Sequence, residues 1–253
     1  MGDIEGMDAV DVPLQSKVSV LEHIVKGHDL RETLELICRQ TEAVDPLMRC
    51  CVMMVDPIAG CLRMSAAPSL PAIFHAEMDA LEIGTGEASC AAAALSQQPV
   101  FVDDVAKDPL WAIYSDLANR VGFHACWSHP IINDKSETLG TLAMYWDEKR
   151  KPAPDDINFL KTQSELCALA IDHARTTGSL RESEMTSRAL LEGSPVCNKI
   201  IDMDSRFIYM STAGIEMLKI PDIEARYGCV YPPDFYAEEM RAPLVEHLER
   251  AKA

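Results

Sequence analysis

The chain has 253 residues, 48% hydrophobic and 25% charged, an ordinary composition for a soluble protein of one large or two small domains. Its 40 Asp and Glu against 23 Lys and Arg give a formal net charge of -17. Such a surface repels phosphate groups, because binding them requires Lys and Arg to displace counterions. We therefore expect neither nucleic acid nor an anionic membrane as a partner.

Two further features of the sequence indicate a protein of the cytoplasm. No segment approaches the ~20 apolar residues that span a bilayer, and the acidic first residues lack the basic start of a secretory signal.

Nine cysteines are an odd number for a closed disulfide set, and neither a Cys-x-x-Cys motif nor zinc-like Cys/His spacing occurs. We expect most of these cysteines to be small buried hydrophobes, and we expect no metal site and no cofactor.

The first part of the chain reads as a tail followed by two helices. Residues 1–16 lack periodicity and are expected to form a loose tail. Leu21, Ile24 and Val25 have the spacing of an amphipathic helix. Asp29, with Glu32 three residues later, predicts the capped start of a second helix. The buried stripe of that second helix is predicted to consist of Leu30, Leu34, Ile37 and Cys38.

Strands and short helices then alternate. The sequence predicts that Ser89 caps a helix beginning at Cys90, that residues 103–114 form a loop or short helical turns, and that residues 116–121 form another helix. Strands clustered among helices indicate an α+β domain with a central antiparallel sheet. The predicted strands are residues 50–55, 61–65, 99–102, 124–132 and 138–146.

A long helix is predicted to begin with Asp155 as its cap and to carry Leu160, Cys167 and Ile171 at helical spacing. Residues 176–178 are expected to weaken it, and a second helical stretch over 180–191 stops at the Gly-Ser-Pro of 193–195. This predicts a domain boundary near 175–190. The pattern that follows predicts strands at 199–202 and 207–210 and helices at 213–218 and 238–251.

Residues 83–131, IGTGEASCAAAALSQQPVFVDDVAKDPLWAIYSDLANRVGFHACWSHPI, followed by LGTLA at 139–143, resemble the GAF domains of bacterial histidine kinases and cyclic-di-GMP turnover proteins. The resemblance covers residues 17–175. Residues 189–218, ALLEGSPVCNKIIDMDSRFIYMSTAGIEML, resemble the beginning of a PAS domain. PAS domains have a five-stranded sheet, so two strands in residues 194–253 imply a partial PAS unit, joined to the GAF domain by a helical linker over 176–193.

The GAF resemblance implies a small-ligand pocket between the sheet and the helices on one face. Its candidate lining is aromatic with a few polar groups, which suits a small effector. Each aromatic side chain could instead be core. The candidates are Trp111, Tyr114, Cys126, Trp127 and Ser128.

Asp103 and Asp104 follow a predicted strand directly. They could recognise a cationic or hydrogen-bonding ligand or a metal, or they could form turns through their backbone contacts.

Two thiols are candidates for redox chemistry. Cys90 falls in the first turn of a predicted helix, where the helix dipole favours a thiolate. Cys126, in the sequence Phe-His-Ala-Cys, could face the same pocket; both could equally be packed hydrophobes. These positions are similar to those of the cysteines of free-methionine-sulfoxide reductases, which have a GAF fold. Trp127 stands where those enzymes have an acidic residue, which argues against that activity.

Together these features predict the sensory input region of a signalling protein, without catalytic residues of its own. An effector would bind the GAF domain, the helix over 155–191 would pair in a homodimer, and a downstream output domain would receive the signal. The apolar stripe of that helix could instead pack on the GAF sheet. The alternatives are a stand-alone interaction or thiol-redox module and, less favoured, a free-methionine-sulfoxide reductase-like enzyme.

Overall fold

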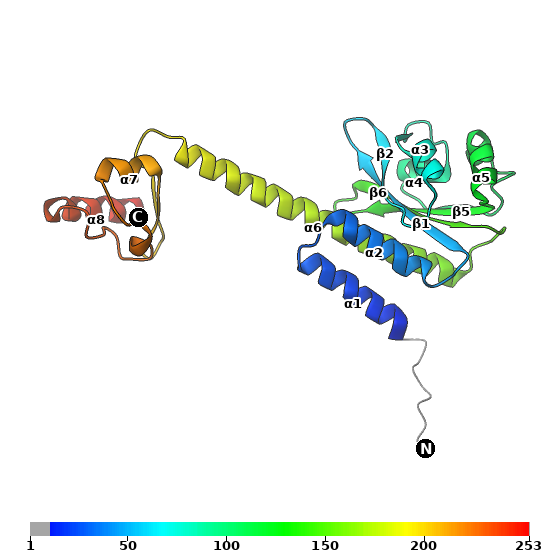
Figure 1. Ribbon diagram of the computed structural model, residues 1–253, viewed down its shortest axis with the longest axis horizontal. Coiled ribbons are helices and arrows are strands. Elements are labelled where there is room, and N and C mark those ends of the chain that lie inside the picture. The colour runs from blue at the N-terminus through cyan, green and yellow to red at the C-terminus, as the bar shows by residue number, and fades with distance from the viewer. Residues whose placement is uncertain (1–10, 253) are drawn as a thin grey trace, which may run out of the picture. The chain divides into compact units, whose positions relative to one another are not determined.

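The computed structural model describes residues 11–252, with side chains from residue 17 onward, and it divides into two compact units after Thr177 (Figure 1). The first unit contains α1 Asp11–Val25, α2 Leu30–Glu42, β1 Met48–Asp56, β2 Cys61–Ala66, α3 Ala72–Met78, β3 Leu81–Glu82, α4 Ser89–Ser96, β4 Val100–Val102, the 3₁₀ helix η1 Pro109–Tyr114, α5 Ser115–Val121, β5 Ala125–Ile132 and β6 Thr138–Trp146. α6, Pro154–Glu192, begins in this unit and continues into the second.

Six strands form one antiparallel sheet in the order β3-β2-β1-β6-β5-β4. The predicted α+β class with a central antiparallel sheet is therefore confirmed. β3 was not predicted, because a strand of two residues leaves no alternation in the sequence to detect.

Alternation along the strands separates two cores, one on each face of the sheet. The core on one face joins the sheet to α1, α2 and α6, and the core on the other joins it to α3, α4, η1 and α5 (Figure 1). Neighbouring strand residues take opposite sides, so Cys50 belongs to the first core and Cys51 to the second. The sheet is thus buried on both faces.

The N-terminal helices correct one prediction and confirm another. Part of the predicted tail, from Asp11 onward, belongs to α1; residues 1–10 lie outside the described residues. The helix predicted from Leu21, Ile24 and Val25 is present but starts earlier than expected, and α1 contributes Val20 and Ile24 to the core on the α6 face. Asp29 is the N-cap of α2, and its carboxylate accepts from the backbone N–H groups of residues 31 and 32, as predicted.

α6 corrects two predictions. It is continuous over 39 residues, so residues 176–178 do not interrupt it. One glycine costs a helix only about 1 kcal/mol relative to alanine, which a long helix tolerates. The helix begins at Pro154 rather than being capped by Asp155, and proline suits the first helical position because its missing N–H is not needed there. The stripe of Leu160, Cys167 and Ile171 packs on the sheet.

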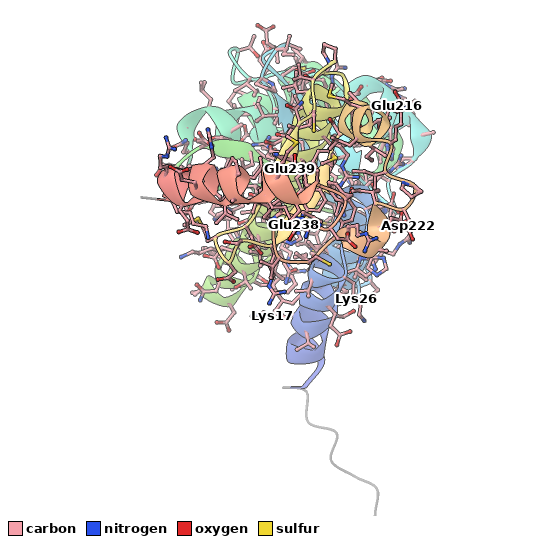
Figure 2. All side chains as sticks on the ribbon, turned by 90° about the vertical axis from the view of Figure 1, so that its left-hand side faces the viewer. Lys17, Lys26, Glu216, Asp222, Glu238 and Glu239 are labelled. Carbon is pink, nitrogen blue, oxygen red and sulfur yellow. The ribbon has the colours of Figure 1, made fainter. Side chains whose placement is uncertain are left out.

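The second unit contains β7 Lys199–Ile201, β8 Phe207–Met210, α7 Thr212–Leu218, the 3₁₀ helix η2 Glu224–Arg226 and α8 Glu238–Lys252. β7 and β8 pair antiparallel, and a single bridge joins Arg206 to Val230. A small core gathers beside them, consisting of Phe207, Met210, Ile220, Tyr231 and Tyr236. Glu238 and Glu239 lie in the first turn of α8, where the helix dipole favours negative charge (Figure 2).

Candidate functional site

Strand alternation divides the predicted pocket residues between the two faces of the sheet. Cys126 belongs to the core on the α4 face, together with Trp111 and the half-buried Tyr114. Trp127, between Cys126 and Ser128, belongs to the core on the α6 face. The prediction of one pocket containing all five residues is therefore wrong for Trp127, because neighbours on a strand point to opposite sides.

Ser89 is the centre of a buried polar cluster on the α4 face. Its Oγ accepts from Trp111 Nε1 at 3.3 Å and from Ser128 Oγ at 3.1 Å, and it lies 3.0 Å from Cys126 Sγ. Ser89 therefore does not cap α4 as predicted. The helix has Ala88 at its N-cap with no side-chain hydrogen bond, and the Ser89 hydroxyl instead satisfies buried partners.

Three thiols surround this cluster, and burial suppresses their ionisation. Cys90 Sγ lies 3.4 Å from Ser128 Oγ and 3.7 Å from Tyr145 Oη, and Cys51 Sγ lies 3.6 Å from the same tyrosine oxygen. Burial raises the pKa of Cys90, of Cys51 and of Cys126. Of the two interpretations of Cys90, this favours the packed hydrophobe over the reactive thiolate, because the desolvation of a fully buried thiol outweighs the dipole of a short helix.

Asp103 and Asp104 contact three lysines, two of them in the loop between β6 and α6. Asp104 pairs with Lys149 at 2.8 Å and with Lys107 at 3.5 Å, and Asp103 lies 3.8 Å from Lys151. The contact with Lys149 is the main cause that lowers the pKa of Asp104. The structure thus places both carboxylates beside lysines and apart from the buried cluster, Asp104 in a close ion pair with Lys149 and Asp103 in a loose contact with the exposed Lys151.

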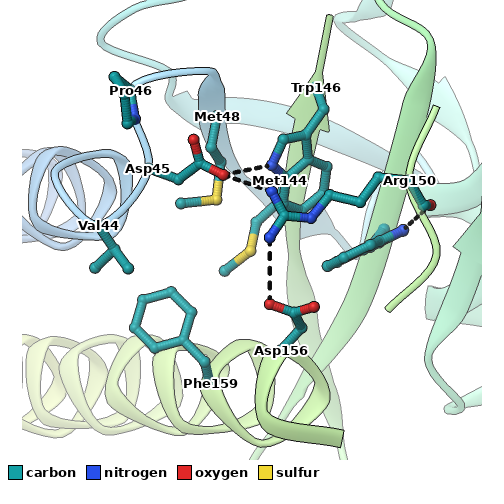
Figure 3. Close-up of a pocket in the computed structure, with 10 residues that line it drawn as sticks. Val44, Asp45, Pro46, Met48, Met144, Trp146, Arg150, Asp156 and Phe159 are labelled. Atoms are coloured by element: carbon teal, nitrogen blue, oxygen red, sulfur yellow. Dashed lines mark hydrogen bonds and ion pairs between the residues drawn. The ribbon is translucent and has the colours of Figure 1, made fainter. Parts of the chain in front are cut away.

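A pocket of about 190 Å³ lies on the α6 face of the sheet (Figure 3). The loop before β1, the ends of β5 and β6, the loop after β6 and the first turns of α6 all contribute to it. Its walls combine aromatic rings, methionines and two carboxylates. The lining residues are Val44, Asp45, Pro46, Met48, Trp127, Met144, Trp146, Arg150, Asp156 and Phe159.

The Arg150 side chain connects two carboxylates of this pocket. Its Nη1 donates to Asp45 Oδ2 at 2.6 Å, and its Nη2 lies 3.6 Å from Asp156 Oδ1 (Figure 3). The guanidinium carbon lies 5.7 Å from the ring centroid of Trp127 and 5.2 Å from that of Trp146, within cation–π range. The pocket therefore holds a cation of its own chain, with two carboxylates as its partners and the packed indole pair of Trp127 and Trp146 beside it.

The carboxylate of Asp45 is ionised at neutral pH. Burial raises its pKa, but hydrogen bonds from the N–H of Leu47, from Trp146 and from Arg150 outweigh that effect, and the net pKa lies below the ordinary value of 3.8. Trp146 Nε1 donates to Asp45 Oδ2 at 3.2 Å.

Apart from Trp127, sequence reasoning missed the residues of this pocket. Asp45 lies between a helix and a strand, and Arg150 lies in a run of charges at 147–151, a context typical of a solvated loop. The one available signal was Trp146, at the end of a strand and on the same face as Trp127 by alternation.

Known proteins place this fold in a family. The GAF domain family matches residues 27–172. The GAF domain of a phosphoenolpyruvate-protein phosphotransferase from Coxiella burnetii superposes with a TM-score of 0.56 at 20% identity, over 68% of this chain and 99% of that one. Free methionine-R-sulfoxide reductase from Neisseria meningitidis superposes with a TM-score of 0.54 at 14% identity, over 70% and 98%. The chain belongs to the GAF domain family.

A curated relative is similar over a longer stretch. The methyl sulfide methyltransferase-associated sensor of Methanosarcina acetivorans is 30% identical over 190 residues, which are 75% of this chain and 19% of that protein. The chain thus spans about a fifth of the length of this relative.

Within residues 11–252 no helix combines the length and apolar character needed to cross a bilayer. In the same range no group of three or more His, Cys, Asp or Glu side chains is arranged to hold a metal ion. All nine cysteines lie in this range, and none forms a disulfide.

Proposed function

We propose that this chain is the sensory input region of a signal-transduction protein, in which the GAF domain binds a small effector and α6 carries the signal onward. The observation that supports this most strongly is that α6 begins in the pocket. Asp156 and Phe159, in the first two turns of the helix, line the cavity, and the same helix continues without interruption to Glu192. A ligand can bias α6 only through different contacts in two states, and these residues offer such contacts.

The second unit fits the beginning of a PAS domain in this proposal. Its antiparallel β7–β8 pair, followed by the short helix α7, has the order expected from the PAS resemblance. Residues 194–253 would then be the partial PAS unit, with residues 176–193 as the linker. A downstream output domain of the histidine kinase or cyclic-di-GMP type would receive the signal in the cytoplasm.

The linker part of α6 favours pairing with a second copy. The side chains of residues 178–190 are all exposed. Leu169, Leu180 and Leu190 are 47%, 60% and 72% exposed and fall on one heptad seam. The seam positions between these leucines are polar: His173, Thr176, Ser183 and Ser187. Polar residues at seam positions reduce coiled-coil stability, so the proposed parallel homodimer is weak and can change register.

A thiol-redox module is the second candidate, and the Ser89 cluster supports it by holding Cys51, Cys90 and Cys126 near one tyrosine. Because burial raises the pKa of all three thiols, such chemistry would require the α4 face to open first.

Native mass spectrometry of the protein purified without added ligand from a cytoplasmic lysate tests the proposal. A bound mass that is released on denaturation is the expected result. A chain that carries no ligand, and gains none from a metabolite library while it remains folded, would contradict effector binding.

A further inference from the structure

We infer that the pocket between Trp127, Trp146, Asp45 and Asp156 binds a small organic cation of the methylated-ammonium class, and that the Arg150 side chain occupies the cation's place until the ligand arrives. This inference rests on the proposed function and names its effector class.

The charge of the pocket favours a cation. Asp45 and Asp156 contribute two carboxylates, and Arg150 is the one basic side chain among the ten lining residues. The pocket therefore keeps a net negative charge even with Arg150 in place. An incoming anion would meet this excess of negative charge, whereas a cation would be attracted to it.

The walls suit a cation that carries methyl groups. Recognition of quaternary ammonium ions depends on aromatic faces, which attract the charge while their apolar surface contacts the methyl groups. Trp127 and Trp146 pack on each other with ring centroids 4.1 Å apart, so they present one continuous indole surface to one side of the cation, and Phe159 adds a third ring. Met48 and Met144 complete the apolar lining with side chains that adapt to irregular shapes.

The size of the pocket limits the ligand. Its volume of about 190 Å³ can be compared with the roughly 30 Å³ that a water molecule occupies in the liquid. This space is what remains with Arg150 in place, and its room for about six water-sized groups already accommodates a trimethylammonium head with a short substituent.

The side chain of Arg150 can leave the pocket to make room for such a ligand while its backbone stays in place. Its backbone is fixed, because its N–H donates to the carbonyl of Asp103 at 3.3 Å and its carbonyl accepts from Trp127 Nε1 at 3.3 Å. Its side chain is 31% exposed and can turn into solvent without moving the loop. A bound cation would then contact the same carboxylates and indoles.

The exchange would reach α6 directly. Asp156 Oδ2 accepts from the backbone N–H of Ala153 at 2.9 Å, immediately before the helix, while Oδ1 faces Arg150. A guanidinium donates hydrogen bonds to the Asp156 carboxylate, whereas a quaternary ammonium has no N–H to donate. Exchanging one for the other therefore changes the hydrogen bonds that Asp156 accepts at the start of the helix.

Isothermal titration calorimetry with choline chloride, and with its uncharged isostere 3,3-dimethylbutan-1-ol, tests the inference. We expect choline to bind and the alcohol to bind at least about tenfold more weakly, because it lacks the charge that the rings attract. Asp156→Asn should weaken choline binding about fivefold, since it removes one carboxylate. Arg150→Met should strengthen it, because the competing cation is gone, whereas Lys151→Met, which alters the adjacent exposed lysine, should leave it unchanged.

Equal binding of choline and the alcohol would overturn the inference. So would absence of choline binding to both the wild type and Arg150→Met, with circular dichroism showing that both are folded. If choline fails while native mass spectrometry detects another bound mass, the effector belongs to a different class and the proposed function stands. If neither experiment detects a ligand, both fall.

Discussion

Arg150 and Asp45 are 105 positions apart in the chain, and their side chains meet at 2.6 Å. The contact joins the loop after β6 to the loop before β1, at the place where α6 begins. Asp45 Oδ2 also accepts a hydrogen bond from Trp146 Nε1, so the same carboxylate holds an arginine and an indole on one side of the sheet.

Replacing Asp45 should destabilise the GAF unit. Asp45→Asn removes the charge that pairs with Arg150 and weakens the acceptor of Trp146, and we expect a loss of about 1–2 kcal/mol in the free energy of unfolding. Urea denaturation followed by tryptophan fluorescence measures it. Asp134→Asn, at an exposed position of the β5–β6 turn, is the matched control and should change stability by less than about 0.5 kcal/mol.

The effect of Asp45→Asn should depend on pH. The pKa of Asp45 is lower in the folded protein than in the unfolded chain, so its contribution is complete above the unfolded value of about 4 and is lost as pH falls through the lower folded value. The difference in stability between wild type and variant should therefore shrink below about pH 4. A difference that stays constant down to the acid transition would show that the charge of Asp45 contributes nothing.

Two glycines should respond in opposite directions to alanine. A Cβ at Gly140 on β6 would lie 2.1 Å from the carbonyl oxygen of Met53, so the backbones of β1 and β6 would have to separate. We expect Gly140→Ala to cost about 3 kcal/mol or more. A Cβ at Gly178 in α6 meets nothing within 4 Å, so Gly178→Ala should raise the thermal stability of α6, by up to about 1 kcal/mol. Thermal melts followed by circular dichroism distinguish the two variants, and a harmless Gly140→Ala would contradict this packing of the sheet.

The rate at which each thiol reacts with a reagent such as 5,5′-dithiobis(2-nitrobenzoate) should depend on its burial in the folded protein. Cys229 is exposed and should react in the fast phase, which Cys229→Ser should remove. Cys90 and Cys126 are buried with raised pKa values and should react only as fast as the unit opens. Fast labelling of Cys90, located by peptide mass spectrometry, would instead support the redox module.

The heptad seam on α6 predicts a concentration-dependent dimer. Leu180→Lys places a charge on the seam and should shift sedimentation velocity toward monomer. Met185→Lys is the matched control, since Met185 is 73% exposed but lies off the seam, and it should sediment like the wild type. Equal behaviour of the two variants would assign the exposed leucines no role in pairing.

The sequence predicted the sheet well and the site poorly, for a physical reason. Runs of β-favouring residues bounded by turns leave a local signal, as does the Asp29 cap, and the strands and the cap are present in the structure. The alternation of side chains along a strand, applied residue by residue, is enough to place Trp127 and Cys126 on opposite faces of the sheet. The contacts of Arg150 with Asp45 and Asp156 depend on the register of distant segments, which no local pattern encodes.

Hydrogen–deuterium exchange of the wild type, Arg150→Met and Lys151→Met tests whether a change in the pocket alters amide exchange along α6. The proposed signalling role depends on such a change. We expect Arg150→Met to change exchange both at residues 154–160 and at residues 178–192, while Lys151→Met changes neither. A change confined to residues 154–160 would show that α6 starts in the pocket but does not transmit its state.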